Sequence, residues 1–272
     1  MFFRKTSTFL ILPFALICSK SFAQAQKVTY NTNTFWSKTE VNQIFDEKKW
    51  GLGFDFVYRT KNELGQGSIF TSMLRESYRP WFHYQFSQNA RLSISPIGYM
   101  NTQDYIGKPV DYLRLPYHEF RTTFQFFHHL KQAQGRVMHT WRYRYELRWQ
   151  EQPALDDYRY FNRFRLRYRI RVGLNSSDFY ANKTLYTAIS NEIGINFGKN
   201  VPYMFNQNRL YIGMGYRFLT AARVELRYVD RVRARGATGF EYDMDKGIMV
   251  GIYIDQVSLL GTKDILKVRY FD

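Results

Sequence analysis

Arginine dominates the residues of this chain that could carry chemistry, and its spacing is regular. Between Tyr160 and Leu174, arginines alternate with large apolar residues at Arg163, Arg165, Arg167, Arg169 and Arg171. On a β-strand this spacing places all five guanidinium groups on one face, whereas a helix would scatter them around its axis. Guanidinium groups bind carboxylates and phosphates through paired N–H donors, so the row predicts ion pairing or the attraction of anions.

Further charged residues fall on the same face when each segment is read with a period of two. The basic cluster expected there also contains Arg142, Arg144, Arg148, Arg209 and Arg217. Its expected acidic partners are Glu146, Glu192 and Glu225. We expect Glu146 to lie within the arginine row, because their segments would be neighbouring strands. Glu192 and Arg209 are also expected on neighbouring strands. The same is expected of Glu225 and Arg217. The wider inward set adds Arg75, Arg79, Arg223, Arg227, Glu40, Asp55, Glu119 and Asp255.

The five histidines form no recognisable catalytic or metal-binding motif. None of them is followed two residues later by the serine that a His-x-Ser hydrolase motif requires; they are His83, His118, His128, His129 and His139. The pair His118-Glu119 begins like a zinc-binding helix, but Thr122 occupies the place of the second histidine. We therefore predict no catalytic residue, no metal and no cofactor.

Alternation with a period of two also defines the elements that must position these side chains. The predicted strands are 32–45, 50–61, 69–86, 90–100, 115–130, 136–149, 159–174, 183–197, 208–219, 223–234, 246–256 and 263–271. Strands of ordinary globular proteins average about five or six residues, whereas membrane-spanning strands need about nine to eleven. Most of the predicted strands reach the longer class. Aromatic residues are frequent near their ends, as in the girdles of membrane barrels, and include Trp50, Trp81, Trp141 and Trp149.

A long strand with one lipid-facing side must have both of its edges paired, so the sheet has to close on itself. We therefore predict an all-β fold, an antiparallel transmembrane β-barrel of about 12 strands. The alternative is a soluble barrel or β-sandwich whose apolar face turns inward. An even strand count would put the longer gaps, 101–114, 198–207 and 235–245, on the periplasmic side, which is the reverse of the usual arrangement.

The first 23 residues are predicted to be a cleaved signal peptide. Arg4 and Lys5 form a basic start, residues 9–17 form a short apolar core, and Ser21-Phe22-Ala23 resembles a cleavage site. We divide the chain into a signal peptide, 1–23, and an outer-membrane β-barrel domain, 24–272. The expected location is the cell outer membrane, and the outer-membrane lipid is the expected partner.

Two stretches of sequence resemble a known family. These are Asn191-Glu192-Ile193-Gly194-Ile195-Asn196 and the run from Phe205 to Phe218, and the pair 145–149 and 163–168 is similar to the family's preceding strands. They resemble the family called domain of unknown function 2490. The resemblance implies an outer-membrane barrel of Gram-negative bacteria, mainly Bacteroidetes, and implies no activity.

The net charge of +16 first suggests a nucleic-acid partner. Alternation places the aromatic rings and the arginines on opposite faces, however, whereas a single-strand binder needs both on one face, so we expect no nucleic acid.

Two interpretations of the basic lumen stay open: a structural barrel plugged by ion pairs, or a narrow anion-selective, porin-like barrel with small anions as partners. The enzymatic alternative is a lipid-modifying hydrolase that uses His128, His129 and His139 near the barrel mouth.

Overall fold

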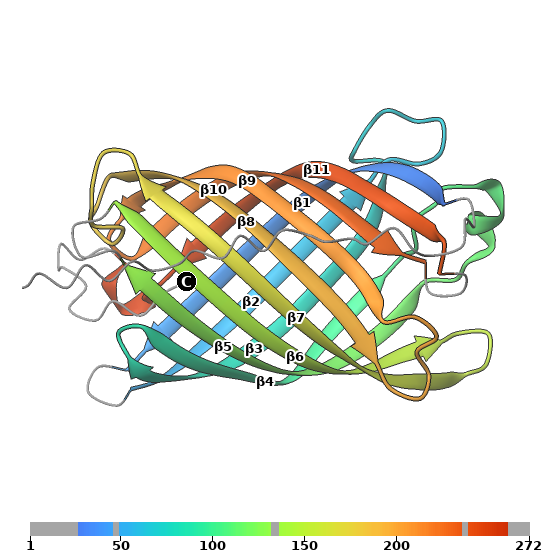
Figure 1. The fold of residues 1–272 in the computed structure, drawn as a ribbon, viewed down its shortest axis with the longest axis horizontal. Helices are drawn as coiled ribbons and strands as arrows, with labels where there is room; N and C mark the ends of the chain where they lie inside the picture. The colour runs from blue at the N-terminus through green and yellow to red at the C-terminus, as the bar shows by residue number, and fades with distance from the viewer. Residues whose placement is uncertain (1–26, 46–48, 132–135, 236–238, 261–272) are drawn as a thin grey trace, which may run out of the picture.

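The fold is a closed β-barrel (Figure 1). The computed structural model describes residues 27–45, 49–131, 136–235 and 239–260. The strands are β1 (Val28–Ile44), β2 (Trp50–Lys61), β3 (Ser72–Ser87), β4 (Ala90–Thr102), β5 (Tyr117–Lys131), β6 (Val137–Gln152), β7 (Asp157–Gly173), β8 (Thr184–Phe197), β9 (Phe205–Leu219), β10 (Ala222–Ala234) and β11 (Glu241–Ile254). There are two short 3₁₀ helices among the described residues: η1 (Pro109–Leu113) lies between β4 and β5, and η2 (Val257–Leu259) follows β11. None of the helices among the described residues has the length and apolar character needed to cross a membrane.

Each strand pairs with its neighbours in sequence, and the closing pair is β1 with β11. Consecutive strands are antiparallel, whereas β1 and β11 are parallel from Val28 beside Glu241 to Val41 beside Ile254. The start of β1 and the end of β11 therefore lie at opposite ends of the barrel. We call these ends the Val28 end and the Ile44 end, after the first and last residues of β1.

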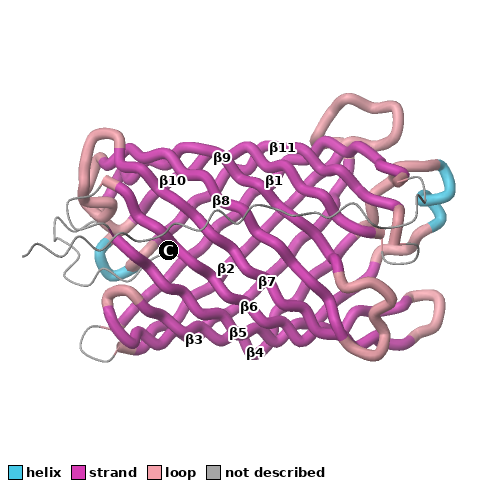
Figure 2. Tube along the Cα trace, in the orientation of Figure 1, coloured by secondary structure: helices cyan, strands magenta, loops and turns pink. Residues whose placement is uncertain are grey.

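The predicted all-β barrel is confirmed, with one strand fewer among the described residues than the count of about 12 that the alternation gave. The twelfth predicted strand, 263–271, lies outside the described residues, as does the predicted signal peptide, 1–23. With eleven described strands, β1 begins at the Val28 end and β11 finishes at the opposite end. The longer gaps of the sequence analysis all fall at the Val28 end (Figure 2).

The two faces of the sheet differ sharply in polarity, as period-two alternation requires. Side chains on the inner face are largely polar or charged and buried, including most of the arginines. Side chains on the outer face include many large apolar groups that stay exposed, such as Phe54, Phe82, Ile189, Leu226 and Ile248. These apolar side chains therefore remain exposed, because no other segment among the described residues packs over them.

Candidate functional site

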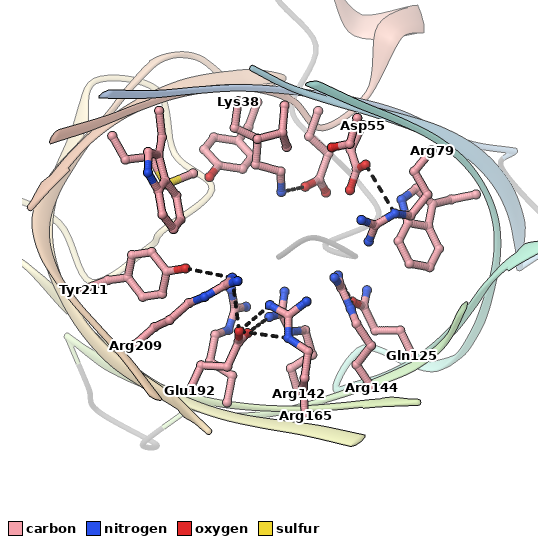
Figure 3. A pocket seen from close by; sticks show the side chains of 18 of the residues that line it. Lys38, Asp55, Arg79, Gln125, Arg142, Arg144, Arg165, Glu192, Arg209 and Tyr211 are labelled. Atoms are coloured by element: carbon pink, nitrogen blue, oxygen red, sulfur yellow. Dashed lines mark hydrogen bonds and ion pairs between the residues drawn. The ribbon is translucent and has the colours of Figure 1, made fainter. Parts of the chain in front are cut away.

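A basic cavity occupies the inside of the barrel (Figure 3). Its volume is about 110 Å³, enough for several water molecules or one small anion with part of its hydration shell. Fifteen of the residues that line it are lysine or arginine, and three are aspartate or glutamate. The three acidic residues are Glu40, Asp55 and Glu192. The wall of the cavity therefore carries a large surplus of positive charge.

Glu192 is the centre of the ion pairs on one side of the cavity (Figure 3). Its carboxylate accepts a hydrogen bond from Arg165 Nε at 2.9 Å and a longer one from Arg209 Nη1 at 3.5 Å. Arg142 also donates to it through Nη2. The side chain of Glu192 is 1% exposed, so three guanidinium groups share one buried carboxylate. The expected neighbourhood of Glu192 and Arg209 is observed in this cluster.

Glu146 lies among the arginines of β7, where the alternation placed it. Arg163 Nε donates to Glu146 Oε2 at 2.6 Å, and Arg165 Nη1 donates to Oε1 at 3.3 Å. Arg144 is farther away, with its Nη1 atom 3.8 Å from Glu146 Oε1. A neighbouring carboxylate holds the next arginine of β6, since Arg148 Nη2 donates to Glu119 Oε2 at 2.7 Å.

Glu225 and Arg217 lie on the neighbouring strands β10 and β9, as expected, but each of them pairs with another residue. Glu225 accepts a hydrogen bond from Arg169 Nη2 at 2.8 Å and also pairs with Arg227. Arg217 instead donates to Asp255 Oδ2 at 2.6 Å, beyond the end of β11. Across this pair of strands Arg217 stands opposite Arg223, and Glu225 stands opposite Gly215.

The predicted site residues separate into two groups. Those that line the cavity are Arg142, Arg144, Arg163, Arg165, Arg167, Arg169, Arg209 and Glu192. Those that do not line it are Arg148, Arg171, Arg217, Glu146 and Glu225, all of them buried. The structure thus brings seven of the ten predicted arginines to one cavity.

Several arginines in the cavity wall have no carboxylate partner. Within residues 27–45, 49–131, 136–235 and 239–260, no carboxylate lies within ion-pair distance of Arg59, Arg75 or Arg167. Arg59 instead lies over the ring of Trp36, with its guanidinium carbon 3.7 Å from the ring centroid. Arg75 Nε donates to Thr102 Oγ1 at 2.9 Å. Arg167 has a buried Nε atom with no hydrogen-bond partner.

The sequence analysis missed some lining residues that alternation could have identified. Residues of one strand have the same parity when their numbers differ by an even number, and they then lie on the same face of the sheet. Arg59 has the same parity as Asp55 on β2, and Arg121 has the same parity as Glu119 on β5. The placement of Trp81 in an outward aromatic girdle is wrong. Trp81 is 4% exposed and lines the cavity, because it shares the parity of the inward Arg79 on β3.

The histidines of the enzymatic alternative do not converge. His129 faces the interior, where its Nδ1 atom lies 3.1 Å from Thr140 Oγ1. His139 lies on the other face of β6 from the inward Arg142, and its Nδ1 atom lies 2.7 Å from the hydroxyl of Tyr168. His128 has the opposite parity to His129, so these side chains lie on two faces of the sheet. Among the described residues, no group of three or more His, Cys, Asp or Glu side chains could hold a metal ion.

The connection between β4 and β5, residues 103–116, reaches across the Val28 end to β10 and β11. Tyr105 donates from its hydroxyl to Asp245 Oδ2 at 2.9 Å. Arg235 Nη1 donates to Asp111 Oδ2 at 2.9 Å. Lys108 Nζ donates to Glu241 Oε1 at 2.9 Å. The connection is therefore fastened to the far wall by polar contacts and narrows this mouth of the barrel.

Charges at this mouth shift the pKa values of the contact residues. Burial would raise the pKa of Asp111, but the backbone N–H of Gly107 and the guanidinium group of Arg235 hold it below its ordinary value. The hydrogen bond to Glu241 raises the pKa of Lys108. Both contacts are therefore charged near neutral pH and fasten the connection there.

The Ile44 end is narrowed by the connection between β7 and β8, residues 174–183. Phe179 from this connection is buried against Met138 and Tyr186 on the inner face. Its carbonyl oxygen accepts a hydrogen bond from Arg217 Nε at 2.9 Å. Both ends of the barrel therefore carry a connection that contacts the inner face or the far wall.

Comparison with known proteins supports the resemblance seen in the sequence. A family model described as "Protein of unknown function (DUF2490)" matches residues 33–251, which includes most of the barrel. A comparison with curated proteins found no significant match.

Proposed function

The chain belongs to the DUF2490 family, and we propose that it is an outer-membrane β-barrel whose narrow, Arg-rich lumen selects small anions. The observation that carries this proposal is the charge of the cavity wall, with fifteen basic and three acidic lining residues. A wall of one sign raises the local concentration of counter-ions and repels ions of like charge. Small anions should therefore enter the lumen and cations should be excluded.

The outer surface supports the membrane part of the proposal. The strands are 12 to 17 residues long, which exceeds the length needed to cross a bilayer. Large apolar side chains are exposed on the outer face of β2, β3, β8, β10 and β11. A closed barrel leaves no unpaired strand edge in hydrocarbon, so this surface can lie against lipid.

The connections support one orientation in the membrane. Barrels of bacterial outer membranes have short periplasmic turns and longer extracellular loops. Two-residue turns join β3 to β4 and β9 to β10 at the Ile44 end. The Val28 end has the connections 62–71 and 103–116, the second of which is the longest between described strands, whereas the Ile44 end has one connection as long as 62–71, residues 174–183. We therefore assign the Ile44 end to the periplasm and the Val28 end, with its fastened connection, to the cell exterior.

The number of strands and the side chains inside the barrel limit the width of the proposed path. Eight-stranded barrels are filled by side chains, whereas barrels of about sixteen strands enclose an open channel. A barrel of eleven described strands lies between these classes, and its cavity of about 110 Å³ is interrupted by arginine and glutamate side chains. The path we propose is therefore narrow, with small conductance.

Two experiments test the proposal in order. Unboiled protein from outer-membrane fractions should migrate faster on gels than boiled protein, as folded membrane barrels do. Migration unchanged by boiling, with partition into the soluble periplasm, would refute the barrel in the membrane.

Purified protein in lipid vesicles should then release iodide faster than potassium. Equal release rates, or no release above that of empty vesicles, would refute anion selection. Arg136→Gln provides a matched control, because Arg136 is an exposed residue outside the cavity and its replacement removes the same charge.

A further inference from the structure

We propose that the cavity contains a discrete, saturable binding site for a free oxyanion of the phosphate class. The site lies between the arginines of β6 and β7, Arg142, Arg144 and Arg167, and those of β2 and β3, Arg59 and Arg79. It deepens the proposed function and rests on it, because the anion must enter through the lumen. The anion would complete the ion pairing that the protein itself leaves incomplete.

The first argument is the balance of charge on the β6–β8 side of the cavity. Glu192 is shared by Arg142, Arg165 and Arg209, as described above. Arg167 stands opposite Glu192 in the strand register, yet no ion pair joins it to a carboxylate among the described residues. Buried like charges repel strongly in a medium of low dielectric constant, so this group is incomplete without an anion.

The second argument is the set of buried donors that lack an acceptor. The Nε atoms of Arg59, Arg142 and Arg167 are buried and have no hydrogen-bond partner. Arg79 leaves both its Nε and Nη1 atoms without one, and its Nε atom lies 3.7 Å from Asp55 Oδ1, beyond hydrogen-bond distance. Buried polar groups in native proteins are nearly always paired, and a bound ion or ordered water is the usual explanation when protein supplies no partner. These donors come from opposite walls of one cavity.

The third argument is the orientation of the guanidinium groups. In Figure 3 the nitrogens of Arg79, Arg142 and Arg144 point from two walls toward the open centre of the cavity. Gln125 holds Arg144 in this position, because its side-chain oxygen accepts a hydrogen bond from Arg144 Nε at 2.8 Å. Its ion pair with Glu146 is long, at 3.8 Å from Nη1 to Oε1, so much of the charge of Arg144 stays available to a ligand. The groups are therefore arranged before any ligand arrives, which lowers the cost of binding.

The geometry favours an oxyanion over a halide. A guanidinium group presents its donors as a planar fork that matches two oxygen atoms of one phosphate. A tetrahedral oxyanion offers four such oxygens and accepts from several forks at once, whereas chloride has no preferred directions. The cavity of about 110 Å³ accommodates an anion of this size together with a few water molecules. A lipid headgroup is a poor fit, because the closed sheet separates the cavity from the bilayer.

Isothermal titration calorimetry on the full-length protein in maltoside micelles tests the site. Sodium phosphate should give a saturable isotherm at constant ionic strength, and sodium chloride should give none. Arg79→Gln and Arg167→Gln should each weaken the phosphate affinity about tenfold, because each removes a charge-assisted interaction. Arg136→Gln should leave the affinity unchanged. A linear, non-saturating phosphate response, an equal response to chloride, or an equal loss in Arg136→Gln would overturn the site.

Two further measurements keep the result unambiguous. Arg167→Gln should unfold at a higher temperature than the wild type without phosphate, because repulsion is relieved, and phosphate should stabilise it less. A variant that is destabilised without phosphate and stabilised as much as the wild type by phosphate would contradict the site. Phosphatidylglycerol added to the micelles should leave the isotherm unchanged, and competition would overturn the assignment to a free anion.

The site and the proposed function fail in different ways. Saturable phosphate binding in micelles together with vesicles that release no iodide would refute the anion path and support the site. Anion-selective release without saturable phosphate binding would support the path and refute the site.

Discussion

Replacing Glu192 by Gln removes the carboxylate that Arg142, Arg165 and Arg209 share. Each of these arginines is buried, and Glu192 itself is 1% exposed, so water cannot replace the lost charge freely. The substitution preserves the shape of the side chain and one acceptor oxygen. It therefore isolates the contribution of the negative charge to the stability of the barrel.

The size of the effect follows from the other partners of the three arginines. Arg165 retains Glu146, whose Oε1 atom lies 3.3 Å from its Nη1 atom. Arg209 retains a 2.8 Å hydrogen bond to Gln207 Oε1. Arg142 and Arg209 are both left without a carboxylate, but the contact of Arg209 with Glu192 is already long at 3.5 Å, so the expected loss is close to that of one broken buried pair rather than three. Such a loss is about 3 kcal/mol in free energy of unfolding.

Urea unfolding in lipid vesicles, followed by tryptophan fluorescence, measures this loss. Glu63→Gln in the connection 62–71 provides the control, with an expected change below about 0.5 kcal/mol. Adding Arg142→Gln to Glu192→Gln should restore about 2 kcal/mol, because the uncompensated charge is removed. A loss of less than about 1 kcal/mol for Glu192→Gln, or no recovery in the double variant, would refute the reasoning that buried charge balance stabilises the wall.

Three other substitutions test separate parts of the structure. Asp111→Asn weakens the contact with Arg235, so hydrogen exchange of the backbone amides in 103–116 should quicken about tenfold. In the wild type the stabilisation from the Asp111 carboxylate is fully present above pH 3.8, its ordinary pKa, and is lost as the pH falls through its lowered pKa. Unchanged exchange in the variant would contradict the fastening. Asp255→Asn should cost roughly 2 kcal/mol in urea unfolding, because two buried arginines lose a carboxylate; wild-type stability would contradict this. Gly215→Ala should cost about 1–3 kcal/mol by overpacking, since the new Cβ would lie 2.3 Å from the ring of Tyr186; a neutral effect would show that Tyr186 can move.

Alternation predicted the fold and much of the cavity because each strand obeys a simple geometric rule. Arg163, Arg165 and Arg167 share one parity and one face, and the structure buries Arg163 and Arg165 on the inner face. Alternation does not identify the ion-pair partners on that face. Glu225 and Arg217 are both buried on neighbouring strands, but Arg217 pairs with Asp255 and Glu225 pairs with Arg169.

Features that depend on distant parts of the chain could not be predicted from local patterns. The number of strands depends on which pair closes the barrel, and nothing in β1 alone specifies a parallel partner 14 residues long in β11. The contact of Tyr105 with Asp245 joins residues 140 positions apart, across the mouth of the barrel. The large positive charge of the sequence identified the surplus of arginine, but only the packed structure distinguishes Arg167, which has no carboxylate partner among the described residues, from Arg165, which has two.

The reversal potential of purified protein in a planar bilayer tests the central proposal most directly. With a tenfold gradient of potassium chloride, a lumen of surplus arginine should give a potential of the sign and near the size of the chloride equilibrium potential. The double variant Arg79→Gln and Arg144→Gln should shift it toward zero, and Arg136→Gln should leave it unchanged. A potential near zero in the wild type, or one of the sign expected for potassium, would contradict an anion-selective lumen.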